Sequence, residues 1–298
     1  MEVKKTVMVA LAGRPNVGKS TLTNAIVGEK VSIVTDKPQT TRHRICGVRQ
    51  RGDIQFVLVD TPGFHKAQNR LGDYMDGVVR AAVGDVDAVM LLIEPSEKVT
   101  KAEELLIEQI KRSGAPCILV INKADTLENK ENLLPVIAKY STLYDFDAIV
   151  PVSAREKDGL EVLLDELSKF AVESPPLFPE GETSDQPEKQ MMAELIREAM
   201  LKCLDKEIPH GIAVEIEKFS QRNSTDIVDC EAVVYCEKAS HKGMIIGKQG
   251  AMLKKISTMA RLEMEKYMGA PVYVRIWVRV KENWRDSLSL LKNFGYEQ

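Results

Sequence analysis

Residues 13–20 read Gly-Arg-Pro-Asn-Val-Gly-Lys-Ser, which matches the pattern G-x-x-x-x-G-K-S of a phosphate-binding loop. The apolar run 7–12 precedes this loop without polar alternation, which is typical of a parallel strand buried on both faces. Residues 20–27 follow with helical spacing and end at Gly28, a residue type favoured just after a helix. A strand, a glycine-containing loop and a helix start place backbone N–H groups around one point. We therefore expect this stretch to bind the phosphates of a nucleotide.

The residue types within this loop suit a nucleotide that carries a magnesium ion. Lys19 can reach the β- and γ-phosphates, and the Ser20 hydroxyl can hold Mg²⁺. The predicted nucleotide contacts in the loop are Asn16, Val17, Gly18, Lys19, Ser20 and Thr21.

Three later segments, each at the end of an apolar run, predict that the nucleotide is a guanine nucleotide. Asp60-Thr61-Pro62-Gly63 supplies an acid that can hold Mg²⁺ through water and a glycine N–H that can meet the γ-phosphate. In Asn122-Lys123-Ala124-Asp125, the carboxylate of Asp125 can accept hydrogen bonds from guanine N1–H and its N2 amine, donors that adenine lacks. Ser153-Ala154 can offer a backbone N–H to guanine O6.

The order of predicted elements indicates two domains. Strands alternate with helices through residues 1–172, which predicts an α/β domain with a mostly parallel, doubly wound sheet. Residues 173–189 hold prolines and acidic residues without periodicity and indicate a linker. Residues 190–298 predict the order helix, strand, strand, helix, helix, strand, helix, an α+β domain with a three-stranded sheet.

A second motif lies between two predicted helices of the C-terminal domain. Residues 245–250 read Ile-Ile-Gly-Lys-Gln-Gly, and the surrounding stretch 241–261 carries lysines and an arginine but no Asp or Glu. That local charge suits a phosphate backbone. Basic and aromatic residues also alternate along 273–281, but we expect these to pair with glutamates of neighbouring strands on a solvated sheet face.

Together these motifs resemble the Era family of translation-factor-class GTPases, which join a Ras-like P-loop domain to a C-terminal type II KH domain. The likeness covers nearly the whole chain, including Gln39-Thr40-Thr41-Arg42. It implies a GTP-binding and GTP-hydrolysing switch that acts in small ribosomal subunit assembly. It also implies that the KH domain binds the 3′ end of single-stranded small-subunit ribosomal RNA through Lys242, Ile245, Ile246, Gly247, Lys248, Gln249, Gly250, Lys254 and Lys255.

The same resemblance assigns roles around the γ-phosphate. The loop before the second strand becomes switch I, with Thr41 holding Mg²⁺ beside Ser20 and Asp60, and with Thr40 as the alternative ligand. Lys19, Thr41 and Gly63 would serve hydrolysis. Asn16 would hold K⁺ next to the phosphates, or would simply cap the loop.

Phe64 follows Gly63 at the position where Ras-like enzymes carry a glutamine that orients the attacking water. An apolar side chain cannot position water by hydrogen bonding, so we expect slow intrinsic hydrolysis. His65 comes next and is expected to be a solvated loop residue, not a base.

Composition limits the remaining alternatives. The chain has 298 residues, a net charge of -3 and five cysteines without a C-x-x-C pair, which favours free thiols in a reducing, cytoplasmic setting. No run approaches the length of a membrane span. We expect a monomer in the cytoplasm, with peripheral association at the inner face of the cell membrane left open. Two rival hypotheses are a P-loop ATPase or kinase and a non-catalytic RNA-binding adaptor with structural nucleotide.

Overall fold

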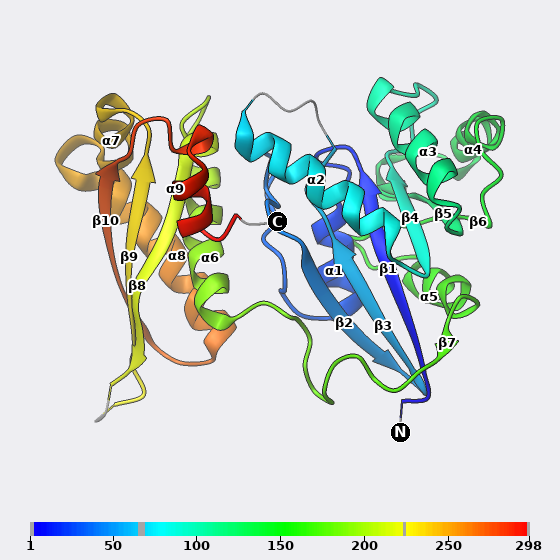
Figure 1. The fold of residues 1–298 in the computed structure, drawn as a ribbon, viewed down its shortest axis with the longest axis horizontal. Helices are drawn as coiled ribbons and strands as arrows, with labels where there is room; N and C mark the ends of the chain where they lie inside the picture. Colours follow the sequence, from blue (N-terminus) through cyan, green and yellow to red (C-terminus); the bar gives the residue numbers. More distant parts are fainter. Residues whose placement is uncertain (1–2, 65–68, 223–224, 297–298) are drawn as a thin grey trace. The chain divides into compact units, whose positions relative to one another are not determined.

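The computed structural model describes residues 3–64, 69–222 and 225–296 (Figure 1). Its contacts define two compact units, each with its own sheet and core. The first unit contains residues 3–32, 41–64 and 75–185. The second contains residues 33–40, 69–74, 186–222 and 225–296.

The first unit is built on a seven-stranded sheet in the order β2-β3-β1-β4-β5-β6, with β7 paired to β1. The neighbours β3, β1, β4, β5 and β6 run parallel, whereas β2 and β7 are antiparallel to their partners. The predicted mostly parallel sheet is therefore confirmed. The strands are β1 (Lys5–Gly13), β2 (Ile45–Arg51), β3 (Ile54–Asp60), β4 (Ala88–Ile93), β5 (Cys117–Ile121), β6 (Ala148–Pro151) and β7 (Val172–Glu173).

Helices cover both faces of this sheet, because alternate residues of the central strands are apolar on both sides. Val9 and Leu11 of β1 enter one core with α1 and α5, while Ala10 and Ala12 enter the other with α2, α3 and α4 (Figure 1). The helices are α1 (Lys19–Val27), α2 (Arg70–Gly84), α3 (Lys101–Ser113), α4 (Leu133–Ser141) and α5 (Leu160–Ser168).

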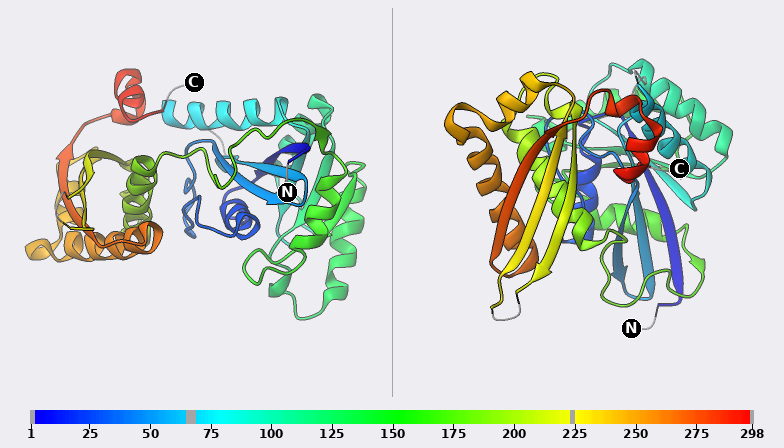
Figure 2. Two further views of the ribbon diagram at one scale, coloured as in Figure 1. Left: turned by 90° about the horizontal axis from the view of Figure 1, so that it is seen from below. Right: turned by 60° about the vertical axis from the view of Figure 1, so that its left-hand side comes forward.

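The second unit has the predicted three-stranded sheet, and its strands lie in the order β10-β9-β8. Helices α6 and α8 share a buried core with one face of the sheet and lie behind the strands in the right-hand view of Figure 2. The elements are α6 (Glu188–Cys203), β8 (Ile212–Gln221), β9 (Val228–Cys236), α7 (Ala239–Ile246), α8 (Ala251–Met268), β10 (Val272–Val280) and α9 (Leu288–Asn293). Short 3-10 turns lie at Ala124–Thr126, Lys130–Asn132, Pro209–Gly211, Lys248–Gly250 and Trp284–Asp286.

The segment predicted as a linker is irregular, but much of it is bonded to the first unit. Its first residue, Glu173, belongs to β7 and pairs with β1. The Gln55 side chain accepts hydrogen bonds from the N–H groups of Leu177 and Phe178, at 2.8 and 3.0 Å, and donates to the Phe178 carbonyl at 2.9 Å. Asp185 accepts from the Cys46 N–H at 2.8 Å. The limits of 172 and 190 for the domains stay predictions.

Helix α2 is absent from our sequence-based expectations. Its apolar residues Leu71, Met75, Val79 and Val83 follow one another every four positions and are all buried. That spacing is the signal by which it can be recognised.

The tight contact between α1 and β2 at Gly47 gives a test of the packing. A Cβ there would lie 2.8 Å from Thr23 Cγ2 and 2.9 Å from Val27 Cγ2, two side chains that are stiff at χ1. We expect Gly47→Ala to lower the free energy of unfolding by about 1–3 kcal/mol. Urea unfolding of the full chain, at fixed nucleotide concentration, measures it.

The matched control is Gly84→Ala, at the exposed end of α2, where a Cβ would meet nothing within 4 Å. It should change stability by no more than about 0.5 kcal/mol. Equal stability of the two variants would contradict the packing at Gly47.

Candidate functional site

The carboxyl ends of parallel strands bring the predicted motifs to one edge of the first sheet. Residues 13–20 follow β1, residues 60–63 lie at the end of β3, residues 122–125 follow β5 and residues 153–154 follow β6. Loops at this edge are where open α/β sheets bind ligands.

The phosphate-loop lysine folds back over its own loop. Lys19 is buried, and its Nζ donates to the carbonyls of Gly13 at 3.2 Å and Arg14 at 3.4 Å. Gly18 starts α1 with a φ of 96°, and a Cβ there would lie only 2.3 Å from Asn122 Nδ2. Only glycine fits that approach, and it leaves the helix N-terminus open toward a phosphate.

Lys19 and Asp60 are both buried, and the opposite charge of each shifts the pKa of the other. Burial lowers the pKa of Lys19 to about 8, against the raising effect of the Asp60 charge. Burial also raises the pKa of Asp60, and the Lys19 charge counteracts that shift. Perturbed pKa values of two neighbouring buried groups are typical of a functional site.

The oxygen atoms around Asp60 fit a magnesium ion. The Ser20 and Thr41 hydroxyl oxygens lie 2.8 Å apart, and Ser32 donates to Asp60 Oδ2 at 2.8 Å. Asp60 Oδ1 is buried without a well-formed hydrogen bond in the described part of the chain. Hydroxyl and carboxylate oxygens are ligands that Mg²⁺ prefers.

The two candidate threonines of switch I are placed differently. The Thr41 hydroxyl lies beside Ser20, whereas the Thr40 hydroxyl lies 2.6 Å from Thr35 Oγ1 and 2.6 Å from the Lys37 carbonyl oxygen. Thr41 is therefore the threonine available to a metal in this conformation.

The Asn122 side chain joins the base motif to the phosphate loop. Its Nδ2 donates to the Val17 carbonyl at 2.8 Å, and its Oδ1 accepts from the Ala154 N–H at 3.0 Å. Asp125 lies exposed in the short turn that follows, and the N–H of Ala124 donates to Val152 O at 3.1 Å. The predicted base-contacting segments are thus bonded together, with the carboxylate of Asp125 open to a ligand.

The segment after β3 lies against the phosphate loop. The Phe64 N–H donates to the Gly13 carbonyl at 3.2 Å, which brings the neighbouring Gly63 close to that loop. The Phe64 ring packs against the core under α2 and α3. His65 lies outside the described residues.

Sequence reasoning did not single out Arg14, Ser32 or Glu94 as site residues. Ser32 reaches Asp60 because Asn24 of α1 accepts hydrogen bonds from the N–H groups of Val31 and Ser32, both at 2.9 Å. Glu94 follows β4 and accepts from Arg14 at 2.5 Å and from Lys123. Arg14 occupies a variable position of the phosphate-loop motif, and no motif marks Ser32 or Glu94: the Asn24 contacts place Ser32, and strand order places Glu94.

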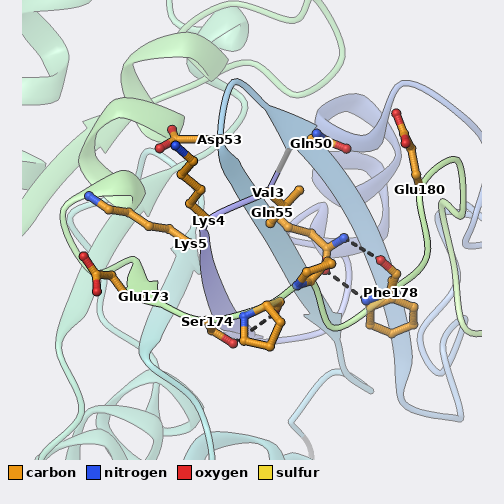
Figure 3. A pocket seen from close by; sticks show the side chains of 12 residues that line it. Val3, Lys4, Lys5, Gln50, Asp53, Gln55, Glu173, Ser174, Phe178 and Glu180 are labelled. Carbon is orange, nitrogen blue, oxygen red and sulfur yellow. Dashed lines mark hydrogen bonds between the residues drawn. The ribbon is translucent and has the colours of Figure 1, made fainter. Parts of the chain in front are cut away.

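A cavity of about 690 Å³ lies at the opposite edge of the sheet, where β1 and β3 begin (Figure 3). Lys4, Lys5, Asp53, Gln55 and Phe178 are among its lining residues. None of the predicted nucleotide contacts lines it, so it is separate from the phosphate loop.

The second motif forms a tight turn between α7 and α8. Gly247 and Gly250 have φ values of 73° and 80°, and a Cβ at Gly247 would lie 2.6 Å from Met252 Cβ. The lysines expected to contact RNA, together with Gln249, are exposed around this turn: Lys242, Lys248, Lys254 and Lys255.

Two other residues expected to contact RNA have a structural role. The Ile245 side chain is fully buried in the core of the second unit, and Ile246 is partly buried against the same core. Their side chains fix α7 under the turn, whose glycines are partly buried and whose lysines are exposed.

The opposite face of this sheet carries paired charges, as expected. Arg275 lies 3.7 Å from Glu231, and Arg279 lies 3.2 Å from Glu217. These ion pairs explain the basic residues of β10 without a nucleic-acid ligand.

The fold and the loop contacts define a P-loop protein of the guanine-nucleotide class that also carries a KH-type domain. Family models agree: residues 8–123 match one described as "50S ribosome-binding GTPase", and residues 207–285 match one described as "KH domain". GTPase Era of Clostridium kluyveri is 46% identical over 294 residues, covering 98% of this chain and 99% of the relative. GTPase Era of Clostridioides difficile is 44% identical over 292 residues, covering 98% of each. The chain belongs to the Era family of GTPases.

Solved structures of Era are similar along the whole chain. A crystal structure of Era in complex with MgGDPNP and nucleotides 1506–1542 of 16S ribosomal RNA has a TM-score of 0.95 at 34% identity. It covers 99% of this chain and 100% of its own. An Aquifex aeolicus Era variant bound to GDP and AlF4⁻ has a TM-score of 0.94, also at 34% identity and with the same coverage.

The exposed carboxylate of Asp125 gives a test of base selection. Asparagine keeps the shape but offers an N–H₂ donor, which suits the C2 carbonyl of xanthine and not the N2 amine of guanine. We expect Asp125→Asn to lower GDP affinity by about 100-fold or more and to favour XDP. Competition of GDP and XDP against a fluorescent nucleotide measures both affinities.

Glu128→Gln is the matched control, since it neutralises another exposed carboxylate three positions further along the chain. It should keep the wild-type preference for GDP. An unchanged guanine preference in Asp125→Asn would rule out this carboxylate as the base contact.

Proposed function

We propose that this chain is a molecular switch that hydrolyses GTP and binds the single-stranded 3′ end of small-subunit ribosomal RNA through its KH domain during small ribosomal subunit assembly. The main support is the Asn122 side chain, which joins the phosphate loop at Val17 to the base-contacting segment at Ala154. The Era complex with 16S ribosomal RNA supports the RNA target.

The proposed nucleotide contacts divide between phosphates and base. Asn16 to Thr21 and Gly63 face the phosphates, while Asn122, Lys123, Asp125, Ser153 and Ala154 face guanine. Mg²⁺, held by Ser20, Thr41 and Asp60, neutralises charge on the β- and γ-phosphates when bound. GDPNP and GDP with AlF4⁻ in the two Era structures support the nucleotide, and the first supports Mg²⁺.

Hydrolysis would rest on charge stabilisation. Lys19 would donate to the phosphate oxygens instead of to the carbonyls of Gly13 and Arg14, which accept from it in this structure. The N–H groups of the phosphate loop and of Gly63 would stabilise the negative charge that develops during attack by water. Phe64 provides no hydrogen bond to that water, so a slow intrinsic rate is part of the proposal. GTP and GDP would order residues 35–42 and 62–69 differently, although residues 65–68 lie outside the described residues.

We also propose that Asn16 binds K⁺ beside the phosphates. Asn16 has a left-handed φ of 67° and is exposed at the mouth of the phosphate loop. An amide oxygen in that position can bind K⁺. The charge of K⁺ would help to stabilise the transition state, to which the apolar side chain of Phe64 contributes no hydrogen bond.

A single-turnover measurement of phosphate release tests hydrolysis and the K⁺ role together. With GTP, Mg²⁺ and excess protein, we expect release at least about tenfold faster in KCl than in NaCl. Asn16→Ala should lose most of this preference, because it removes the side-chain amide oxygen that is proposed to bind K⁺. ATP should release phosphate in neither salt.

Three results would contradict parts of this proposal. Equal rates of phosphate release in KCl and NaCl for the wild type would contradict the proposed role of K⁺. Release from ATP would favour the P-loop ATPase or kinase. Absence of phosphate release from GTP, with and without RNA, would favour an adaptor in which the nucleotide is structural.

The RNA contact would lie at the turn between α7 and α8. The exposed lysines give the phosphate-binding charge, and close backbone approach at Gly247 and Gly250 allows about four unpaired nucleotides to be clamped.

We propose that the chain works as a cytoplasmic monomer; association with the inner face of the cell membrane is an alternative location. No helix in the described ranges is long and apolar enough to cross a membrane.

Two substitutions at Gly250 separate charge from backbone strain. Gly250 has open space around it and a φ of 80°, so Asp and Asn are strained alike and differ mainly in charge. We expect Gly250→Asp to weaken binding of a single-stranded small-subunit rRNA 3′-end oligonucleotide by about tenfold more than Gly250→Asn. Fluorescence anisotropy measures it, and GTP affinity serves as the internal control, which should stay unchanged. Equal RNA affinities would argue against phosphate contact at this turn.

A further inference from the structure

Glu94 lies between the two halves of the proposed nucleotide site. It directly follows β4, which pairs with β1 on one side and β5 on the other. The phosphate loop follows β1 and the base motif follows β5. The side chain of Glu94 therefore stands at the edge of the sheet between these two segments.

Its carboxylate bonds to both segments at once. Glu94 Oε2 accepts from the Arg14 guanidinium of the phosphate loop at 2.5 Å. Glu94 Oε1 accepts from Lys123 Nζ of the base motif. Arg14 Nε also lies 3.3 Å from a carboxylate oxygen of Glu103, which is buried at the start of α3. The side chains of Arg14, Glu94 and Lys123 are only 31%, 29% and 38% exposed, so solvent screens these ion pairs incompletely.

The backbone at Lys123 makes this anchor important. Lys123 has a φ of 62°, a left-handed conformation that disfavours any residue with a Cβ. The turn that it begins carries Asp125. The ion pair between Lys123 and Glu94 therefore holds Lys123, whose backbone is strained, immediately next to the base-contacting turn.

We propose that Glu94 is a positioning residue for nucleotide binding, which fixes the phosphate loop and the base-contacting turn at one separation through Arg14 and Lys123. This inference rests on the proposed nucleotide site. Asn122 joins the same segments through the backbone at Val17, and Glu94 provides a second, charged connection between them. Without it, the base turn and the phosphate loop move more independently, and a bound nucleotide is released sooner.

The test is the dissociation rate of fluorescent GDP from the full chain. Glu94→Gln keeps the size of the side chain but removes its charge, and should speed dissociation about three- to thirtyfold. Glu104→Gln is the matched control: it makes the same chemical change at an exposed position on α3 and should leave the rate unchanged. Glu94→Asp keeps the charge on a side chain that is one methylene shorter, and should lie between wild type and Glu94→Gln.

Two further readouts separate a charged connection from a general effect on folding. Raising NaCl from about 0.05 to about 0.5 M should speed GDP dissociation more steeply in the wild type than in Glu94→Gln, because salt screens the ion pairs that the variant lacks. In the Lys123→Met background, Glu94→Gln should add less than about a twofold change, because the shared ion pair is already lost.

The outcomes separate this inference from the proposed function. A wild-type chain that forms no GDP complex would overturn both. A wild-type complex whose release rate is unaffected by Glu94→Gln, or effects of Glu94→Gln and Lys123→Met that simply multiply, would overturn the role of Glu94 alone. Should Glu94→Gln fail to fold, Glu94→Asp and its salt dependence decide the question in the same way.

Discussion

The side-chain amide of Asn122 holds the nucleotide site in one arrangement. It donates to the Val17 carbonyl and accepts from the Ala154 N–H, so three loops from three strands share one buried group. Because Asn122 is almost fully buried, loss of either hydrogen bond would leave a polar group unsatisfied away from water, at a cost of about 1–3 kcal/mol. The same contact requires glycine at position 18, since a Cβ would overlap with the amide. Asn122 of the base motif thus restricts position 18 of the phosphate loop to glycine.

The two units present their sites in different ways. In the first unit, bonds between side chains and backbone connect loops that follow different strands. In the second, the turn between α7 and α8 depends mainly on backbone conformation at Gly247 and Gly250, above a core that includes Ile245. A site joined by side chains can distinguish ligands by hydrogen bonding, whereas a glycine turn with exposed lysines recognises a charged backbone.

Much of the fold and of the site could be predicted because the relevant signals are local. The phosphate loop, Asp60, Asn122 and the Gly247 turn each stand at a strand or helix end that apolar periodicity reveals. Glu94 and Ser32 could not be predicted in this way. Their roles depend on which strands are neighbours and on how Asn24 bends the following loop, and neither is encoded in a short motif.

Other differences have simple physical causes. The segment after residue 172 lacks periodicity because its contacts are irregular, such as those of Gln55 with Phe178, and not because it is free. Conversely, α2 has a regular apolar spacing, so its position is encoded in the local sequence. Ile245 belongs to an RNA-binding pattern in sequence but serves the core, because an apolar residue next to a glycine turn anchors the preceding helix.

The burial of Lys19 and Asp60 has a consequence for the stability of the folded protein. One carboxylate oxygen lacks a well-formed hydrogen bond, and desolvation disfavours the charge on both groups. A ligand that binds only the folded form stabilises that form by an amount that grows with the ratio of its free concentration to its Kd. Guanine nucleotide with its metal is therefore a folding partner as well as a substrate.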